Sequence, residues 1–573
     1  MRGWQSTLFE FGLLAVLGVV LVAPIWAVVH AGFQDDRGAL SLDWYRWVLS
    51  EPLYRAGLVN SLLMALCATS LCLLISIPLA LIAENFNFAG KRLWLAAIMV
   101  PMVLPPFVGA IGVKGLLSRN GGVNLWLQQL GWLGPGQYID FLAYPFVACF
   151  VLEALALYPI TFLNIQAALA NIDPALDEAA RNQGAGPWRR FWCITLPLMR
   201  PGIFAGATIV FISTFTELGT PLMVGFREVT AVQVFSKLET TNPEGDAYAL
   251  VVILLVISVL LYLVGKFVLG RGGAGMLAKA TAAAQPRRLR GGWGLLAALP
   301  FALVMGVAIL PHVAVVLGSV TATGIIEVDP AHLTLRFHAD LLSDVMAIGE
   351  PTRGLSARAV ANSLRYSLIA TAVTVVLAFA IAYPVVRRPS WRTTLLDSLA
   401  MLPLAVPGLV MAFGYFVMTQ GQSWLASLNP LRNDPTPLLV TAYVVRRMPF
   451  LVRSCAAGLE QTSVALEEAA QNLGAGRLRV MATIVAPLLA ANFIAGGLIV
   501  FSRSMLEVSD SLVLTFDRHT YPITKAIYDL ADNPSSGLQQ AAALGVWGMV
   551  ILIVTIVVAS LALGKRLGAL FRI

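Results

Sequence analysis

The amino-acid sequence predicts an all-α integral membrane protein, with about twelve transmembrane helices arranged as two parallel six-helix repeats. Three observations carry this prediction. Of the 573 residues, 58% are hydrophobic and only 12% are charged, whereas a soluble globular chain carries about 25% charged residues. Twelve segments are apolar over the roughly 20 residues that a membrane span needs. Features of the first six segments also recur in the second six.

The net charge of +8 has two explanations. A protein that binds nucleic acid gathers its basic residues into patches, and no basic run interleaved with aromatic residues occurs here. Membrane proteins instead collect Lys and Arg at the cytoplasmic ends of their spans. We therefore expect a lipid bilayer, and no nucleic acid, around this chain. The five cysteines lack CxxC spacing and the five histidines form no ligand set, so we expect neither disulfides nor a bound metal.

Residues 1–270 form the first expected repeat. Its first apolar segment is longer than the 7–15 apolar residues of a signal peptide, so we expect a retained helix. The six spans of this half are expected at 8–32, 59–84, 93–117, 142–168, 200–225 and 247–270.

A Gly/Ala-rich basic stretch, residues 271–293, follows and predicts a flexible cytoplasmic linker. Residues 294–573 form the second repeat. Its spans are expected at 294–320, 361–386, 393–418, 437–460, 490–515 and 541–564.

Matching residues support the repeat. Asn60-Ser61-Leu62 recurs as Asn362-Ser363-Leu364, 302 positions later, whereas Glu217 recurs as Glu507 at an offset of 290. The difference places about twelve extra residues in the first half, near 118–141, in a loop that tolerates insertion. Six is an even number of spans, so the repeats are parallel and share one orientation.

Prolines and glycines in the third span of each half recur at the offset of 302. They are Pro101, Pro105 and Gly112 in the first half, and Pro403, Pro407 and Gly414 in the second. These prolines predict broken or kinked helices.

Lys and Arg indicate the orientation. With the N-terminus in the cytoplasm, the inner segments hold more basic residues than the longer outer loops, among them Arg189, Arg190, Arg287 and Arg288. This asymmetry satisfies the positive-inside rule.

One loop on the expected cytoplasmic side occurs twice. Within residues 170–198 it contains Glu178-Ala179-Ala180, three residues, Gly184, nine residues, and then Ile194-Thr195-Leu196-Pro197. Within residues 460–488, Glu468-Ala469-Ala470, Gly474 and Ile484-Val485-Ala486-Pro487 follow at the same spacing.

The residue types of this loop predict a short helix, a tight turn and a second helix. Asp173-Pro174 is typical of a helix start, residues 175–183 favour a helix, and Gly184 permits the turn. We expect the second short helix at about 187–193. Small residues on one face allow a partner to approach closely, and two copies indicate two partner surfaces. The alternative is an ordinary amphipathic connector.

With this spacing, EAA-x3-G-x9-I-x-L-P, the chain resembles the permeases of binding-protein-dependent ABC importers over essentially its whole length. The resemblance implies the type I importer permease fold, in which each loop forms a coupling helix that docks on an ATP-binding subunit. The residues that would couple are Glu178, Ala179, Ala180 and Gly184, and Glu468, Ala469, Ala470 and Gly474. The second copy departs only at Ala486, where the family usually has leucine.

The chemistry of ATP is expected in another chain. The sequence contains no G-x4-G-K-[ST] phosphate-binding motif and suggests no nucleophile–base pair, so we expect a permease subunit that is not an enzyme and binds no cofactor. The resemblance implies two ATP-binding subunits, which use ATP and Mg, and a periplasmic substrate-binding protein. It places the chain in a bacterial inner membrane, with a cytoplasmic N-terminus.

The fused two-repeat form resembles the ferric-iron permeases most closely. Similar permeases serve thiamine, polyamines, 2-aminoethylphosphonate and phosphorylated sugars, so ferric iron is preferred among several solutes. A secondary transporter driven by an ion gradient would explain the spans, but it would not explain the paired loops.

Ionisable groups inside spans are costly and often functional. Glu217 and Glu507 occupy equivalent positions in the fifth spans, within polar stripes. The residues expected to line a translocation pathway are Glu217, Glu507, Ser213, Thr220, Arg503 and Asp510. The alternative is a hydrogen-bond network, or an Arg503–Glu507 pair at i, i+4. Arg446, Arg447 and Arg453 of the fourth span are interpreted as structural or snorkelling.

Overall fold

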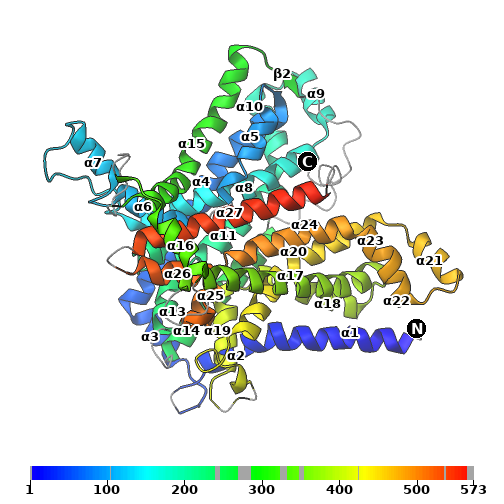
Figure 1. The fold of residues 1–573 in the computed structure, drawn as a ribbon. Coiled ribbons are helices and arrows are strands. Elements are labelled where there is room, and N and C mark those ends of the chain that lie inside the picture. Colours follow the sequence, from blue (N-terminus) through cyan, green and yellow to red (C-terminus); the bar gives the residue numbers. More distant parts are fainter. Residues whose placement is uncertain are drawn as a thin grey trace.

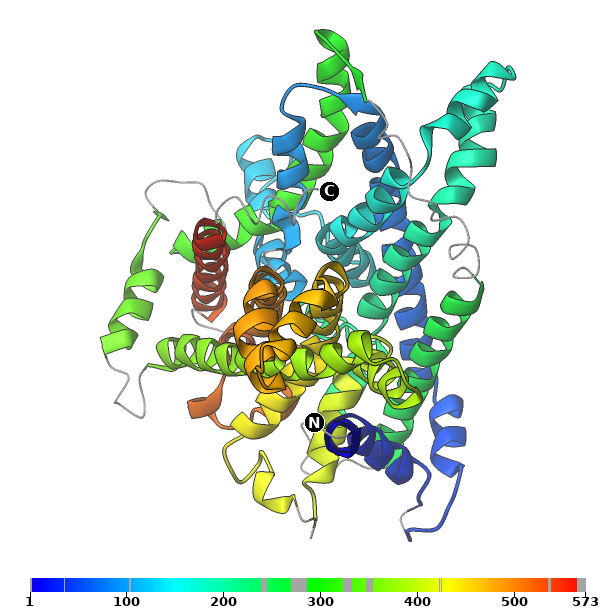
Figure 2. The same cartoon turned by 90° about the vertical axis from the view of Figure 1, so that its right-hand side faces the viewer.

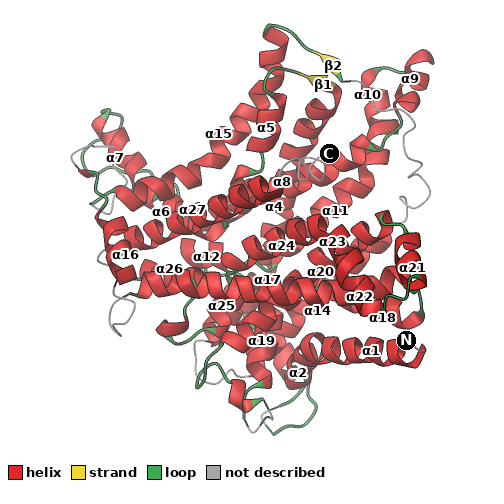
Figure 3. Cartoon of the chain, turned by 45° about the vertical axis from the view of Figure 1, so that its right-hand side comes forward, coloured by secondary structure: helices red, strands yellow, loops and turns green. Residues whose placement is uncertain are grey.

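The computed structural model describes residues 3–35, 37–102, 105–238, 245–268, 286–322, 332–346, 354–421, 423, 425–533 and 537–563. These residues are largely helical (Figures 1 and 3). The linker expected at 271–293 lies outside the described residues as far as 285, so its flexibility stays a prediction.

Long helices follow the expected spans of the first half. They are α1 (Gly3–Leu17) with the π-turn η1 (Gly18–Val22) and α2 (Ala23–Gly32), α4 (Pro52–Asn85), α5 (Lys91–Ala97) with η2 (Val100–Met102) and α6 (Pro106–Leu117), α8 (Pro145–Ala170), α11 (Leu196–Phe215) and α14 (Gly245–Val268). Shorter helices connect them: α3 (Asp43–Ser50), α7 (Gly122–Gln129), α9 (Pro174–Asn182), α10 (Pro187–Arg190) with η3 (Phe191–Thr195), α12 (Gly219–Val224) and α13 (Thr230–Leu238). Helix α7 lies in the loop for which the repeat offsets predict extra residues.

The second half follows the same order. Its long helices are α15 (Gly292–Val320), α17 (Leu355–Arg387), α18 (Trp391–Met401) with η6 (Leu402–Leu404) and α19 (Gly408–Met418), α20 (Thr436–Gln461), α24 (Ala490–Met505) and α27 (Gly537–Leu563). The shorter ones are α16 (Arg336–Met346), η7 (Ala426–Leu428), α21 (Val464–Asn472), α22 (Arg477–Val480), η8 (Met481–Val485), α23 (Ala486–Leu488), α25 (Ser509–Leu514), η9 (Arg518–Thr520) and α26 (Ile523–Ala531). Two short parallel strands, β1 (Phe86–Asn87) and β2 (Arg287–Arg288), pair with each other, and β2 lies within the expected linker.

Eight helices in the described ranges are long and apolar enough to cross a membrane, and up to eleven spans result if each of three bent helix pairs is one span. Helix α20 lies at the remaining expected position. Because this helix contains Arg446, Arg447 and Arg453, it is too charged to be identified as a span from its composition alone. A helix or a bent pair therefore lies at each of the twelve expected positions, and the all-α membrane fold is confirmed.

The third span of each half is bent, as the prolines predict. The angle is 87° between the α5 and α6 segments and 104° between the α18 and α19 segments. Pro105 (φ −59°, ψ 141°) and Pro407 (φ −58°, ψ 142°) precede α6 and α19 in nearly the same backbone conformation. The repeated prolines thus produce the same kink twice.

The prediction of continuous fifth spans at 200–225 and 490–515 is wrong. Helix α11 ends at Phe215 and α24 at Met505, and three non-helical residues precede α12 and α25. In the first half, the carboxylate of Glu217 accepts hydrogen bonds from the N–H groups of Gly219 and Thr220, which would otherwise be unpaired at the start of α12. The hydropathy of the sequence does not reveal this break in the first half, because the residues on both sides of it are apolar.

The two halves interlock. Within each half the second, fourth and fifth spans pack together: α4 with α8 and α11, and α17 with α20 and α24. The first span, however, packs against the other half. Helices α1 and α2 contact α18 and α19, and α15 contacts α5 and α6. The last spans follow this exchange, because α14 contacts α2 and α27 contacts α15.

The repeated glycines of the third spans permit this exchange. A Cβ atom on Gly414 would lie 2.6 Å from the carbonyl oxygen of Pro24 in α2, and a Cβ on Gly112 would lie 2.6 Å from the amide nitrogen of Val315 in α15. Any larger residue would force the helices apart. The equivalent glycines therefore serve equivalent contacts between the halves.

The repeated Asn-Ser pairs hold short helices at one end of the bundle. The hydroxyl of Ser61 accepts a hydrogen bond from the N–H of Thr230 (3.0 Å), and that of Ser363 from the N–H of Ile523 (2.8 Å). These bonds fix the starts of α13 and α26 to α4 and α17. The side-chain amides of Asn60 and Asn362 add bonds to the carbonyl groups just before α13 and α26.

Helices α13 and α26 meet where the halves meet. The rings of Phe235 and Tyr528 contact edge to face, with centroids 6.0 Å apart, and the ammonium of Lys525 lies 5.8 Å from the ring centre of Phe235. At the opposite end of the molecule lie the N-terminus, α9, α10, α21 and α22, all on the right in Figure 3. Figure 2 is viewed from the side of the N-terminus.

Candidate functional site

The first candidate site consists of the paired loops, residues 170–198 and 460–488. Helix α9 starts after Asp173, whose carboxylate accepts the N–H of Ala175 (2.9 Å), and α21 starts after Ser463, whose hydroxyl accepts the N–H of Ala465 (3.3 Å). The helix start expected at Asp173-Pro174 is therefore observed. The second short helix does not end near residue 193, because α10 continues through the π-turn η3 into α11.

Glycine ends the first helix of each loop in the same way. Gly184 has φ +81° and Gly474 has φ +88°, a conformation that side chains with a Cβ rarely adopt. A Cβ at either position would meet no atom within 4 Å. The backbone conformation, and not lack of space, therefore requires glycine.

The predicted coupling residues have the same degree of exposure in both loops. Six of them are exposed, and the last alanine of each triplet is half-buried. The exposed six are Glu178, Ala179, Gly184, Glu468, Ala469 and Gly474, and the half-buried two are Ala180 and Ala470. Both loops lie at the same end of the molecule, on the right in Figure 3.

Their side chains differ next to this shared backbone. In the first loop Trp188 is 73% exposed and stacks on Trp192, with ring centroids 6.5 Å apart. In the second loop Leu478 occupies the position of Trp188 and is 79% exposed. The two surfaces have the same shape of backbone and different apolar side chains.

The second candidate site lies at the breaks of the fifth spans. In the first half, the hydroxyl of Thr220 donates a 2.6 Å hydrogen bond to the carboxylate of Glu153 from α8, which is buried. Glu217 lies beside it and caps α12. Glu153 is an acidic residue within the fourth span, and an acidic residue in a span is in itself a signal of function.

In the second half, Glu507 is bound by two arginines of α20. Arg446 contacts one carboxylate oxygen and Arg447 the other, and Arg446 also lies 3.5 Å from the carboxylate of Asp510. Arg447 further donates a 3.0 Å hydrogen bond to the carbonyl of Arg503. The network therefore joins α20 to the break between α24 and α25.

Of the two interpretations of Arg446 and Arg447, structural or snorkelling, this network agrees with a structural role and contradicts snorkelling. A snorkelling side chain carries its charge to the membrane surface, whereas Arg447 is 6% exposed and pairs with Glu507. The alternative of an Arg503–Glu507 helical pair also fails, because α24 ends between them and Arg503 lies over the ring of Phe450. In the sequence, the signal for this network is a pair of basic residues in the fourth span followed by acidic residues in the fifth.

The two breaks approach each other between the halves. A Cβ on Gly219 would lie 2.9 Å from the side chain of Val508, and Arg446 is near enough to Glu217 to interact with it electrostatically. The structure thus brings Glu217, Thr220, Glu507 and Asp510 to one region. Ser213 is half-buried on α11, and its equivalent in the second half is Arg503 on α24.

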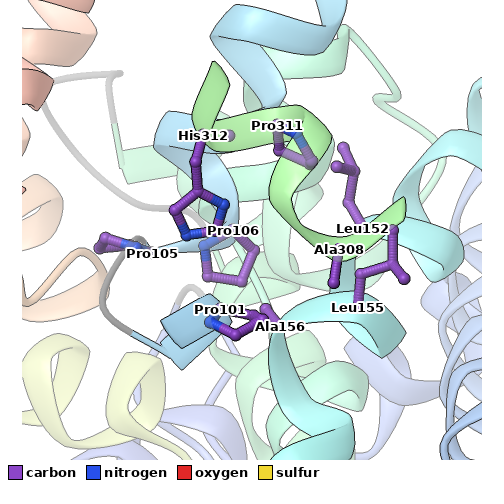
Figure 4. Close-up of a pocket in the computed structure, with 10 residues that line it drawn as sticks. Pro101, Pro105, Pro106, Leu152, Leu155, Ala156, Ala308, Pro311 and His312 are labelled. Atoms are coloured by element: carbon purple, nitrogen blue, oxygen red, sulfur yellow. The ribbon is translucent and has the colours of Figure 1, made fainter. Parts of the chain in front are cut away.

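A small cavity lies beside the kinked third span of the first half (Figure 4). Pro101, Pro105 and Pro106 face Pro311 and His312 of α15 across it. Its volume of about 10 Å³ is at the lower limit for one water molecule. This space is too small for a solute.

Comparison with known proteins agrees with this double arrangement. Residues 76–271 and 374–572 each match the family described as binding-protein-dependent transport system inner membrane component. Each match contains one of the paired loops and one of the breaks.

Some relatives match most of the chain, through both repeats, and others match about one repeat. Ferric transport system permease protein FbpB of Actinobacillus pleuropneumoniae is 26% identical over 498 residues, 86% of this chain and 68% of that protein. The probable ABC transporter permease protein y4fN of Sinorhizobium fredii is 25% identical over 92% of this chain and 89% of its own length. The probable sulfate transport system permease protein cysT of Chlorokybus atmophyticus is 28% identical over 45% of this chain and 86% of its own length.

Proposed function

Because this chain belongs to the family of binding-protein-dependent transport system inner membrane components, we propose that it carries ferric iron across the bacterial inner membrane, driven by separate ATPase subunits. The coarser conclusion, a multi-pass permease of an ABC importer, follows from the family match over both halves. The observation that supports the separate ATPase subunits is the pair of loops, which present the same residues on the same backbone at one end of the molecule.

Two ATP-binding subunits are the proposed partners of the paired loops. Each loop exposes a glutamate and an alanine on a short helix and the glycine that follows this helix, and the sequence contains no phosphate-binding motif of its own. ATP and Mg²⁺ would then be bound by the partner subunits, and this chain would be a non-enzymatic subunit.

The orientation belongs to the same proposal. The N-terminus lies at the end of the molecule that carries the paired loops (Figure 3), and the basic residues of the sequence favour a cytoplasmic position for that end. The opposite end, with α3, α13 and α26, would then face the periplasm. There it would receive solute from a periplasmic binding protein.

The breaks in the fifth spans are the proposed translocation pathway. Glu217, Thr220, Glu507 and Asp510 approach one another between the halves, and Ser213 and Arg503 lie on the helices that lead to them. Alternating access would require the halves to move relative to each other at this point. The competing explanation is a structural ion-pair network, which the contacts of Glu507 with Arg446 and Arg447 also favour.

Ferric iron is preferred because a ferric permease matches this chain through both repeats, whereas the sulfate permease matches about one repeat. Thiamine, polyamines, 2-aminoethylphosphonate and phosphorylated sugars remain alternatives. An ion-gradient-driven transporter is the alternative of another class, and the family match disfavours it.

Docking of the ATPase tests the proposal first. The variant Gly184→Glu/Gly474→Glu is expected to lose the ATPase during co-purification, because a Cβ at positive φ strains the turn by about 1–2 kcal/mol and the carboxylate adds charge. The control is Gly184→Asn/Gly474→Asn, since asparagine tolerates this conformation. Retention of the ATPase by the glutamate variant would contradict docking at the paired loops.

Solute identity is tested in liposomes that contain the permease with its ATPase and binding protein. ATP-dependent uptake of radioactive ferric iron is expected, and excess sulfate or thiamine should leave it unchanged. Uptake of labelled sulfate in place of iron would reject the iron assignment while leaving the importer mechanism intact.

A further inference from the structure

The second of the paired loops is attached to a membrane span by a buried network. Glu467, the residue before the Glu468-Ala469-Ala470 triplet, is 5% exposed. One of its carboxylate oxygens accepts a 2.9 Å hydrogen bond from Arg387, and the other accepts a 2.7 Å bond from the hydroxyl of Tyr383. Tyr383 and Arg387 form the last turn of α17, so the network joins α21 directly to that span.

Arg387 extends the network to the turn between α20 and α21. Its Nη2 donates to both the carbonyl and the hydroxyl oxygen of Thr462, at 3.1 and 2.9 Å. The guanidinium therefore holds the start of α21 while it pairs with Glu467. A charge pair withdrawn from water, with both carboxylate oxygens hydrogen-bonded, keeps one geometry, so α21 and the end of α17 are expected to move together.

The first loop lacks this attachment. At the positions equivalent to Tyr383, Arg387 and Thr462 the chain has Leu81, Asn85 and Ile172. Asn85 bonds to the carbonyl of Leu81 in its own helix.

The acidic position of the first loop is also used differently. Asp177, equivalent to Glu467, pairs with Arg190 inside the loop, and its side chain is 49% exposed. The end of α4 instead leads into β1, which pairs with β2 near the linker.

We propose that Glu467 and Arg387 are positioning residues that transmit movement of the second loop to α17, and that the first loop has no equivalent link. This inference rests on the proposed docking of ATPase subunits at both loops. It makes the two dockings mechanically unequal although their exposed motifs match. Closure of the ATPase at the second loop would turn α17 directly, whereas closure at the first would act through the packing of α9, α10 and α11.

The test uses the complete complex of permease, ATPase subunits and binding protein in liposomes. Spin labels at Ser236→Cys in α13 and Asp532→Cys after α26, in a background without the native cysteines, report movement at the far end without depending on the solute. ATP hydrolysis and co-purification of the ATPase are measured in the same preparations.

Glu467→Gln is expected to retain the ATPase and to reduce the ATP-driven population of the altered label distance at least about fivefold, the lower end of a coupling between sites. Arg387→Gln should act similarly, and the double variant should add little because both residues serve one link. Tyr383→Phe, which keeps the ion pair and therefore the fold, should give a smaller reduction. Asp177→Asn should reduce the response less than Glu467→Gln.

Glu10→Gln is the matched control. Glu10 is as buried as Glu467 and pairs with Arg392 at 2.7 Å, but it joins α1 to α18 and does not touch either loop. It should leave the label response unchanged. The link is overturned if Glu467→Gln and Tyr383→Phe respond as wild type, if Asp177→Asn has the same effect as Glu467→Gln, or if Glu10→Gln also abolishes the response. If the wild type binds no ATPase, the proposed function fails and the link fails with it.

Discussion

At the scale of single residues, the two equivalent glutamates of the fifth spans have unequal surroundings. Glu507 is held by Arg446 and Arg447, whereas Glu217 caps the N-terminus of α12 and has Arg446 only at longer range. A buried charge whose partner is removed costs far more than a lost helix cap. Symmetry in the sequence therefore does not imply symmetry in energy.

Replacing each glutamate tests this difference. Glu507→Ala should lower the free energy of unfolding by about 3–5 kcal/mol, because Arg447 stays buried without its partner. Glu217→Ala should cost about 0.5–2 kcal/mol, the range for a lost cap. Unfolding in detergent, followed by circular dichroism, measures both. Equal losses would contradict the unequal pairing, and normal transport by the double variant would reject the pathway.

Lys237 gives a pH dependence outside the spans. Its ammonium lies 2.7 Å from the carboxylate of Asp246, which also accepts a hydrogen bond from Tyr54. Burial alone would lower the pKa of Lys237, but the hydrogen bond and the charge of Asp246 outweigh it and raise the pKa. A raised pKa in the folded state means that this stabilisation is complete below the unfolded pKa of about 10.4 and is lost as the pH rises through the folded value.

The melting temperatures of wild type and Lys237→Met should therefore differ by the same amount at about pH 7 and about pH 9, and by less at about pH 11. Lys237→Arg, which keeps the charge, is the control and should melt close to wild type at the two lower values. A difference that shrinks already between the two lower values would refute the assignment of the raised pKa.

At the scale of elements, close packing of helices depends on glycines that the repeat places equivalently. Gly112 admits α15 and Gly414 admits α2, each with backbone atoms 2.6 Å from a hypothetical Cβ. Neither neighbour is a flexible side-chain end, so it cannot give way without moving a helix. Glycine is ordinarily unfavourable inside a helix, and here close approach outweighs that cost.

Alanine substitutions should distinguish the effect of helix–helix packing on stability from the effect of helix propensity. Gly414→Ala and Gly112→Ala are expected to destabilise the protein by about 1–3 kcal/mol, as overpacking does. Gly12→Ala in α1, where a Cβ meets nothing within 4 Å, should instead stabilise by about 0.5–1 kcal/mol. Thermal unfolding in detergent gives the sign of each change. A stabilising Gly414→Ala would show that α2 and α19 are not in close contact.

At the scale of the whole molecule, the exchange of first spans interlocks the two halves. Helices α1 and α2 pack on α18 and α19, and α15 packs on α5 and α6, so the first span of each half covers the third span of the other. The paired loops remain attached to separate halves. The proposed alternating access would require the halves to tilt against each other without separating.

Cutting the linker tests this interlocking. A protease site inserted within residues 271–285, once cleaved, should leave the two fragments together during size-exclusion chromatography in detergent, because their contacts do not depend on the covalent connection. Cleavage in a Gly414→Ala background should let the fragments separate more readily. Separation of the cleaved wild type would contradict the exchange.

Local properties of the sequence determined the membrane class, the positions of twelve helices or bent pairs, the proline kinks and the two loops whose first helices end at Gly184 and Gly474. Hydropathy, proline and glycine act on their own segments, so no tertiary contact is needed to infer them. The partners of Glu507, Gly414 and Glu467 were decided only by the tertiary structure. Each lies in a contact between segments far apart in the chain, and side-chain packing and ion pairing in three dimensions leave no local pattern.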